Sequence, residues 1–559
     1  MALKDIFRRK PIAKTIQQGG DGEEFTVLHR VLTVRDLTFF GIAAIIGGGT
    51  FSAIGNACFS GGPAVILLYI ICAIACGFTA MCYAEFASRV PVSGSAYTYA
   101  YVSFGELFAW IIGWALIMEY SIGNIYIAFS WSGYFTNLLE SAHIHLPDWL
   151  TINYRAAHQA FAEGKAGEGM LAWQNAPMIG SLRIIFDLPA VMINLLITYL
   201  VYRGTKESKN FSNAMVVIKL LIIILVIAVG FFYVDIENWV PFMPKGFGGV
   251  MAGVSAVFFA YIGFDAVSTL AEESKNPQRD LPKGMIYSLV ICTALYIILA
   301  LVLTGMVSYE LLGVSDPLAE IFALKGVKWM LFIVSVAAVV AMTSVMLVFQ
   351  LGQPRIWMTM SRDGLLPRRF SSIHPRFKTP GFATIVTGVV VGLPIFFTDE
   401  NFVLDFTSIG TLFAFVLVCG GVLVLSPQSE EELSERQARG KFRIPYINSK
   451  YIFPGIVAIS AIAVYTLFPG YFSETFTISG GKVTNKVSMI IFFLFCIIMA
   501  IVAFRKNLSL IPLLGLVSCC YLLTGMALSN WIWFGVWLLL GLVIYFGFSR
   551  RSSKLNTQA

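Results

Sequence analysis

Charged side chains are scarce in this sequence. Asp, Glu, Lys and Arg together make up 13% of the 559 residues, whereas 57% are hydrophobic. A soluble domain cannot hide so much apolar surface, so the composition excludes a soluble fold. A transmembrane helix needs about 20 mostly apolar residues, and apolar runs of that kind recur along the whole chain. The composition therefore predicts an integral membrane protein made of helices in a lipid bilayer.

Sequence motifs for chemistry are also missing. The chain has no His-Glu-x-x-His, no Gly-x-Ser-x-Gly and no phosphate-binding loop, which argues against a membrane-embedded enzyme. It has no carbonyl-filter sequence of the kind found in channels. His143 and His145 form a close pair without a third ligand in a recognisable spacing, so a solvated loop is favoured over a metal site. We therefore expect no enzyme activity, no metal and no cofactor.

Two further features are missing. All nine cysteines fall within apolar segments, so no disulfide framework is implied. The first 36 residues are polar and basic, and they lack the short apolar core and small-residue cleavage site of a signal peptide. We therefore expect no cleavable signal peptide.

The formal charge of +7 at pH 7 could suggest a nucleic-acid partner, but its distribution argues otherwise. Most of the 39 Lys and Arg residues lie in the two tails and in every second loop between apolar segments. This asymmetry is the positive-inside rule. We therefore expect no nucleic acid, and we predict a multi-pass protein of the inner (plasma) membrane with both termini in the cytoplasm.

The apolar segments divide into about 14 predicted spans, which makes the expected fold all-α. The most charged inside linker separates the tenth span from the eleventh. The predicted parts are a cytoplasmic N-terminal arm at 1–36, a first five-helix repeat at 37–235, a second at 249–426, a cytoplasmic linker at 427–448, four further spans at 449–548 and a cytoplasmic tail at 549–559.

The first span contains three consecutive glycines, Gly47, Gly48 and Gly49. Each costs about 1 kcal/mol of helix propensity relative to alanine, so a broken transmembrane helix is predicted there. Backbone groups freed at bilayer depth are tolerated only inside protein or along a cavity, which would then hold a ligand. Close packing of helices on small residues is the alternative, and this stretch alone does not separate the two. A second interruption, at Gly263 and Asp265 in the sixth span, favours the break, because paired broken helices mark the binding site of secondary transporters.

Each predicted half begins with its broken helix. Because five spans is an odd number, the two halves must have opposite topology. This is the 5+5 inverted-repeat plan of the LeuT-like fold, with broken helices 1 and 6 and four further C-terminal spans.

Besides Asp265, two ionisable residues deep inside predicted spans are candidates for function, Glu119 and Lys219. Glu119 lies near the middle of the third, where an ionisable group is a functional hypothesis by default; the alternative is a protonated structural carboxyl bonded to a neighbouring helix. Lys219 is the one basic residue within a span, and it either snorkels to the interface or lies buried against carbonyls. In the buried case the neutral amine is favoured, so Lys219 could load and release a proton.

Five sequence stretches, taken in order, resemble the amino acid-polyamine-organocation superfamily, and most of all its cationic amino acid transporter family, bacterial members included. They are residues 41–51, 83–97, 113–114, 263–277 and 360–367. Any one of these stretches is weak evidence, but the ordered set is specific. The resemblance implies a secondary amino acid transporter that works by alternating access.

The resemblance also implies where the substrate binds. The amides of Gly48, Gly49 and Thr50 would hold its α-carboxylate, in line with the attraction of a helix N-terminus for an anion, and the Thr50 hydroxyl could add a contact. Phe259 would be the aromatic gate over the substrate. The carbonyls that would meet the α-ammonium lie around Ile45 and Ile46 and at Ala260 and Ile262.

The same resemblance implies proton coupling. Lys219 matches the family's proton-linked lysine, which takes the place of a sodium ion in sodium-coupled relatives, near Thr343 and Ser344 of the eighth span. Glu119 matches an acidic position of the family on the third span. Protons would then be a partner of the reaction together with the amino acid.

Phe349 on the eighth span departs from the family, which has smaller or unbranched side chains in this region. A Phe349 that faced the pocket would leave little room for arginine, so we expect a small or medium neutral amino acid as substrate. The alternatives are a cationic substrate, or an exchanger of the same fold. The sequence leaves the oligomeric state and any small membrane accessory subunit open.

Overall fold

The computed structural model describes residues 8–12, 15, 28–164, 167–180, 182–246, 249–250, 253–314, 316–398, 400–425, 442–467, 483–526 and 528–555. Within these ranges turns and loops join helices, and the one pair of strands is antiparallel and two residues long, β1 (Met178–Ile179) and β2 (Leu182–Arg183). Most of the predicted linker 427–448 and much of the arm 1–36 lie outside the described residues.

The elements follow one another in four groups. The first is α2 (Val34–Ile45), η2 (Gly49–Ala53), α3 (Ile54–Gly61), η3 (Gly62–Ala64), α4 (Val65–Arg89), α5 (Ser95–Ser103) and α6 (Glu106–Ser141). The second is η4 (Asp148–Leu150), α7 (Tyr154–Ala162), α8 (Glu168–Asn175), the two strands, α9 (Leu188–Arg203) and α10 (Thr205–Phe231). The third is η5 (Ile236–Trp239), α12 (Val254–Phe259), η6 (Phe264–Glu273), α13 (Pro277–Met306), η7 (Tyr309–Leu312), α14 (Pro317–Leu324), α15 (Lys328–Arg362), η8 (Arg368–Ser371), α16 (Gly381–Ile395) and α17 (Glu400–Leu425). The fourth is α19 (Ile452–Leu467), α21 (Val483–Lys506), α22 (Leu510–Thr524), α23 (Leu528–Ile544), η9 (Tyr545–Ser549) and α24 (Arg550–Ser552).

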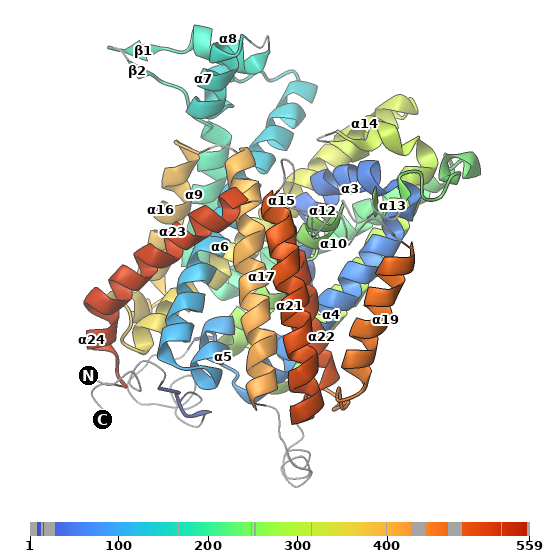
Figure 1. Ribbon diagram of the computed structural model, residues 1–559. Coiled ribbons are helices and arrows are strands. Elements are labelled where there is room, and N and C mark those ends of the chain that lie inside the picture. The colour runs from blue at the N-terminus through green and yellow to red at the C-terminus, as the bar shows by residue number, and fades with distance from the viewer. Residues whose placement is uncertain are drawn as a thin grey trace.

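The long helices form a bundle (Figure 1). Among the described residues, eight helical stretches are long and apolar enough to cross a membrane, and four shorter apolar helices accompany them. The helices α6 and α15 pack against each other at the centre of the bundle, with 89% and 61% of their most apolar windows buried. The corresponding window of the stretch 487–506 in α21 is only 11% buried, so α21 leaves most of its apolar surface for lipid.

The predicted break in the first span is confirmed. Helix α2 starts with a capping box, in which Thr33 and Asp36 each accept a hydrogen bond from the other's backbone amide. It ends at Ile45, and Ile46 is extended, with φ −82° and ψ 97°. The chain resumes helically as a π-helical turn, η2, followed by α3. The low helix propensity of glycine does not by itself determine that α2 ends at Ile45, but it reduces the free energy needed to interrupt the helix there.

The sixth span is interrupted in the same way. Helix α12 ends at Phe259, and after a turn the chain continues as the 3₁₀ helix η6. Gly263 stands at this junction with φ 117°, a conformation that a residue with a Cβ rarely adopts. A Cβ at Gly263 would also lie 3.0 Å from the Ala44 carbonyl carbon of α2. Glycine is therefore required here both by the turn and by the close approach of the two broken helices.

Helix α23, near the C-terminus, is joined to α6 by tryptophans. The indole N–H of Trp114 donates to the Trp537 carbonyl (2.9 Å), and the indole N–H of Trp537 donates to the Trp114 carbonyl (3.0 Å). Their rings stack with centroids 4.7 Å apart. Trp110 adds a bond to the carbonyl of Gly541 (2.8 Å). Each of these three indole N–H groups therefore has an acceptor, and the pairing fixes α23 along the bundle.

Candidate functional site

The broken end of α2 is held by Lys219 of α10. The ammonium Nζ donates to the carbonyls of Ala43 (3.1 Å) and Ile46 (2.8 Å) and to the Ser344 hydroxyl of α15 (2.8 Å). The lysine is fully buried, so the snorkelling alternative is wrong. An ammonium has three donors, and here each has an acceptor. These three bonds join α10, α2 and α15 at the point where α2 unwinds.

Of Thr343 and Ser344, the two residues predicted to lie near Lys219, only Ser344 forms a hydrogen bond with it. Ser344 binds it directly and also donates to the Ala341 carbonyl (2.6 Å). The hydroxyl of Thr343 instead donates to the Val339 carbonyl (2.7 Å) and accepts from the indole N–H of Trp131 (2.8 Å). Thr343 therefore anchors α15 to α6 and makes no recorded bond to the lysine.

The two breaks meet at Tyr296 of α13. Its hydroxyl lies 3.0 Å from the Ile45 carbonyl of α2 and 3.0 Å from the Ala260 carbonyl that follows α12, and it also lies 3.0 Å from the Thr50 hydroxyl. Sequence analysis missed this tyrosine. A hydroxyl in the middle of the apolar seventh span was the available signal, because a buried phenol usually needs a partner.

Gly49 makes this meeting possible. A Cβ at Gly49 would lie 2.5 Å from the Ala260 Cα, a distance that real side chains do not reach. The nearby Gly47 is similarly confined, because its Cβ would lie 2.4 Å from the Val345 side chain. Breaking of the helix and close packing, which the sequence could not separate, therefore occur together at these glycines.

The predicted backbone ligands lie together at this junction. The carbonyls of Ile45 and Ala260 face Tyr296, and that of Ile46 faces Lys219. The Thr50 amide already donates to the Gly47 carbonyl (3.0 Å) within the turn. Ile262 is buried in the turn after α12. The backbone of Phe259 ends α12, but its side chain lies outside what the structure describes, so the predicted gate remains a prediction.

Two protein-family models match this chain. A family model described as amino acid permease matches residues 32–504, and a second, described as the C-terminus of AA_permease, matches residues 508–553. The first match alone covers most of the chain. The chain belongs to the amino acid permease family. Together with the long apolar helices, this makes it a multi-pass membrane protein.

Relatives of the permease align over almost its whole length. The branched-chain amino acid permease BcaP of Bacillus subtilis is 38% identical, with 99% of each chain covered. The methylthioribose transporter of the same organism is 36% identical, with 99% of this chain and 100% of the relative covered. The mitochondrial cationic amino acid transporter 3 of Arabidopsis thaliana is 30% identical, with 99% and 96% covered. These relatives are permeases and transporters rather than enzymes, in agreement with the prediction.

Glu119 of the permease lies on α6 and faces α17. The Thr411 hydroxyl donates to its Oε1 (2.6 Å), as the structural alternative predicts. Its Oε2 has no hydrogen-bond partner within the described part of the chain, although the residue is 4% exposed. A buried carboxyl with a free oxygen costs free energy unless it is protonated or meets a ligand. Glu119 is therefore bonded to α17, and the bonds of Lys219 go to Ala43, Ile46 and Ser344 instead.

Phe349 of α15 lies against α6. Its ring packs on Tyr120 with centroids 5.3 Å apart, and the residue is 8% exposed. One turn further along α15, the amide of Gln353 donates to the Ser121 hydroxyl (2.6 Å). Phe349 and Gln353 thus occupy space between α15 and α6.

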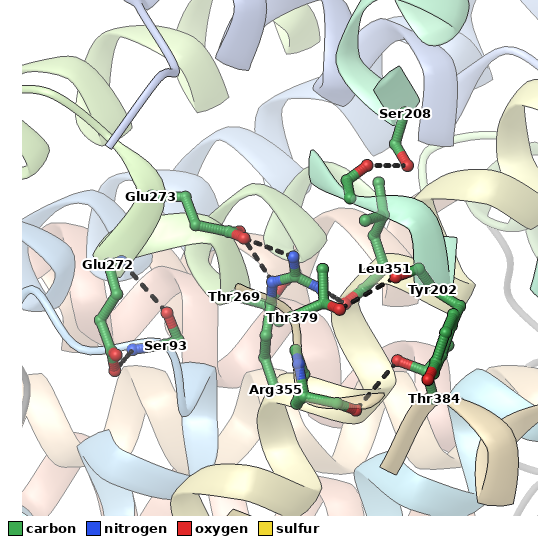
Figure 2. A network of polar contacts seen from close by, with 12 residues as sticks. Ser93, Tyr202, Ser208, Thr269, Glu272, Glu273, Leu351, Arg355, Thr379 and Thr384 are labelled. Atoms are coloured by element: carbon green, nitrogen blue, oxygen red, sulfur yellow. Dashed lines mark hydrogen bonds and ion pairs between the residues drawn. The ribbon is translucent and has the colours of Figure 1, made fainter. Parts of the chain in front are cut away.

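Buried ion pairs hold η6, the second part of the broken sixth span, to α15. The guanidinium of Arg355 forms two bonds with the carboxylate of Glu273, at 2.7 and 2.5 Å. Arg362 donates to Glu272 (2.7 Å), whose backbone amide donates in turn to the Ser93 hydroxyl (3.1 Å). Figure 2 shows Arg355 facing Glu273 and Glu272 facing Ser93. The stretches 263–277 and 360–367 contain the two glutamates and Arg362, but the sequence does not pair these charges, because the partners lie 82 and 90 residues apart.

Proposed function

We propose that the permease is a secondary active transporter that takes up a small or medium neutral amino acid together with protons by alternating access. The observation that carries the proposal is the junction of two interrupted helices, bridged by Tyr296 and fastened by Lys219. Interrupted helices present backbone groups to a ligand without exposing them to lipid.

We propose further that the fold is the LeuT-like 5+5 inverted repeat, with spans 1–5 at 37–235 and spans 6–10 at 249–426, followed by four spans at 449–548. The two interruptions, at Ile46 and at Gly263, support this division because they fall five spans apart. The described ends of the chain meet where Arg8 donates to the Leu555 carbonyl (3.2 Å). This contact supports an even number of spans, about 14, with both termini in the cytoplasm of a cell whose inner membrane holds the protein.

In the proposed binding mode the substrate's α-carboxylate lies on the amides of Gly48 and Gly49, at the N-terminal end of the helical stretch that begins with η2. Its α-ammonium meets the carbonyls of Ile45 and Ala260. Tyr296 bears on this step because its single hydroxyl proton can serve only one of the two carbonyls at a time. The other carbonyl is available to an ammonium donor.

Proton coupling is proposed to act through Lys219. With its proton, the lysine satisfies the carbonyls of Ala43 and Ile46 and the Ser344 hydroxyl at once. A neutral amine has one N–H fewer, so one of these buried acceptors would lose its partner. Loss of the proton therefore loosens the attachment of the broken helix to α10 and α15, which is the movement that alternating access requires.

The neutral substrate is supported by Phe349 and by a relative named as a branched-chain amino acid permease. Two alternatives, a cationic substrate and an exchanger, also remain proposals. Relatives named as cationic amino acid transporters cover nearly the whole chain, and the free Oε2 of buried Glu119 could accept a cationic side chain. An exchanger of the same fold would use the same junction.

A thermal-shift screen of the purified protein against the twenty amino acids and methylthioribose, at two pH values, tests the substrate. We expect neutral aliphatic amino acids to raise the midpoint of unfolding most. Stabilisation chiefly by arginine or lysine would instead favour the cationic alternative. Counterflow in proteoliposomes without any dependence on an imposed pH gradient would favour exchange over proton-coupled uptake.

A further inference from the structure

A cavity of about 580 Å³ lies between the end of α15 with η8 and the C-terminal segment that contains η9 and α24. Three cationic side chains line it: Arg362, Arg368 and Lys554. Serine hydroxyls and the ring of Phe548 complete the wall, and none of the described residues that line it is Asp or Glu. A volume of this size is within the range of small-molecule sites, about 300–1,000 Å³.

Two carboxylates close to Arg362, in the chain or through a hydrogen bond, already have partners of their own. Asp363, next to Arg362 in the chain, accepts from the ammonium of Lys10 (2.5 Å) and from the hydroxyl of Tyr97 (2.7 Å). Glu272 accepts from Nη1 of Arg362 (2.7 Å). Arg368 is exposed at the cavity. Among the described residues, the wall of the cavity therefore carries three cationic side chains and no carboxylate.

The wall that the C-terminal segment supplies is part of the fold. The Lys554 amide donates to the Asp363 carbonyl (3.1 Å), and the Ser553 hydroxyl donates to Glu106 (2.7 Å). Gly364, with φ 82°, lets the segment come close, because a Cβ there would lie 2.4 Å from the Ser552 carbonyl oxygen. The position of Lys554 opposite η8 is therefore set by backbone contacts.

The location indicates the kind of ligand. The helical stretch Leu528–Ser552 is apolar enough to cross the membrane, and the cavity lies at its end, beside Phe548, which is 47% exposed. Guanidinium groups match phosphate oxygens, and basic pockets at the ends of spans bind lipid headgroups. We infer that this cavity binds a phosphate group, and the location favours the headgroup of an anionic lipid as its source over a free phosphate.

The test compares two variants with the same change of charge. Arg368→Gln/Lys554→Gln removes two cations of the cavity, whereas Arg369→Gln/Arg551→Gln removes two exposed neighbours that do not line it. The thermal unfolding midpoint of the full-length protein in detergent is titrated with phosphatidylglycerol, with phosphatidylcholine and with inorganic phosphate. We expect phosphatidylglycerol to stabilise the wild type and the neighbour variant alike, and to need about tenfold more lipid for the cavity variant, which corresponds to about 1.4 kcal/mol.

Equal titrations for the two double variants would overturn the inference, and so would a wild type that neither phosphatidylglycerol nor phosphate stabilises. A response to inorganic phosphate with the same dependence on the variants would uphold the phosphate site and identify free phosphate as its source. A second pair guards against misfolding of the first: Ser371→Asp places a negative charge in the cavity, whereas Ser372→Asp places it beside the cavity. Only Ser371→Asp should weaken the titration.

Discussion

At the scale of single residues, Lys219 combines complete burial with three neutral acceptors. Replacing it with alanine removes the lysine donor from the buried Ile46 carbonyl, at a cost of about 1–3 kcal/mol, and removes the proton carrier. We expect Lys219→Ala to abolish uptake driven by a pH gradient in proteoliposomes. Lys209→Ala on the same helix, which removes a half-buried lysine 3.7 Å from Asp36, is the control and should retain uptake. Wild-type uptake by Lys219→Ala would contradict the coupling proposal.

Phe349 carries the prediction on substrate size. Serine at this position removes the ring that packs on Tyr120 and opens space beside α6. We expect Phe349→Ser to widen acceptance to arginine, measured as competition against the preferred neutral substrate. Phe332 lies on the same helix and is 55% exposed, so Phe332→Ser should change nothing. If Phe349→Ser behaves like this control, the ring faces away from the substrate.

At the scale of elements, the packing of the two broken helices depends on Gly49. Leucine there would drive side-chain atoms into the backbone of Ala260 and force η2 away from the end of α12. We expect Gly49→Leu to lower substrate affinity by at least about tenfold, or 1.4 kcal/mol, in a scintillation-proximity assay. Gly77→Leu on α4 is the matched control, because nothing lies within 4 Å of a Cβ at that glycine. Unchanged affinity in Gly49→Leu would place the substrate elsewhere.

The attachment of η6 to α15 gives a prediction on stability. The side chains of Arg355 and Glu273 are 1% and 0% exposed, so Glu273→Ala leaves a guanidinium buried without its carboxylate. We expect the free energy of unfolding to fall by about 3–5 kcal/mol, seen as a lower thermal midpoint. Replacing both partners with methionine should restore most of the loss, because no unpaired charge remains. The exposed Glu310→Ala should have little effect, and equal effects of the two alanine variants would refute the argument.

At the scale of the whole molecule, the contact of Arg8 with Leu555 places the two described ends of the chain on one side of the bundle. We expect protease-cleavable tags at both termini to be protected in right-side-out membrane vesicles. A tag inserted at Gly164, in the exposed turn after α7, should be cleaved. Cleavage at one terminus only would exclude an even number of spans, and protection of the Gly164 tag alone would reverse the orientation.

Much of this architecture could be predicted from local chemistry. Apolar runs of about 20 residues can satisfy their backbone in a bilayer only as helices, so a multi-helix membrane protein followed from composition. The three consecutive glycines that begin at Gly47 lower the helix propensity of the first apolar run. The interruption after α2 was therefore also predictable. The burial of Lys219 was one of two stated outcomes, since its depth alone could not exclude snorkelling.

The partners of these groups were decided only by tertiary structure. Tyr296 meets the carbonyls of Ile45 and Ala260, and Arg355 meets Glu273, across separations of 251, 36 and 82 residues. Thr343 and Ser344 are neighbours in sequence, yet one binds Trp131 and the other Lys219. Helical periodicity and composition determine which segments cross the membrane and where those segments have low helix propensity. Which side chain meets which carbonyl depends on how the helices pack against one another, because each bond needs two groups that only packing brings within about 3 Å.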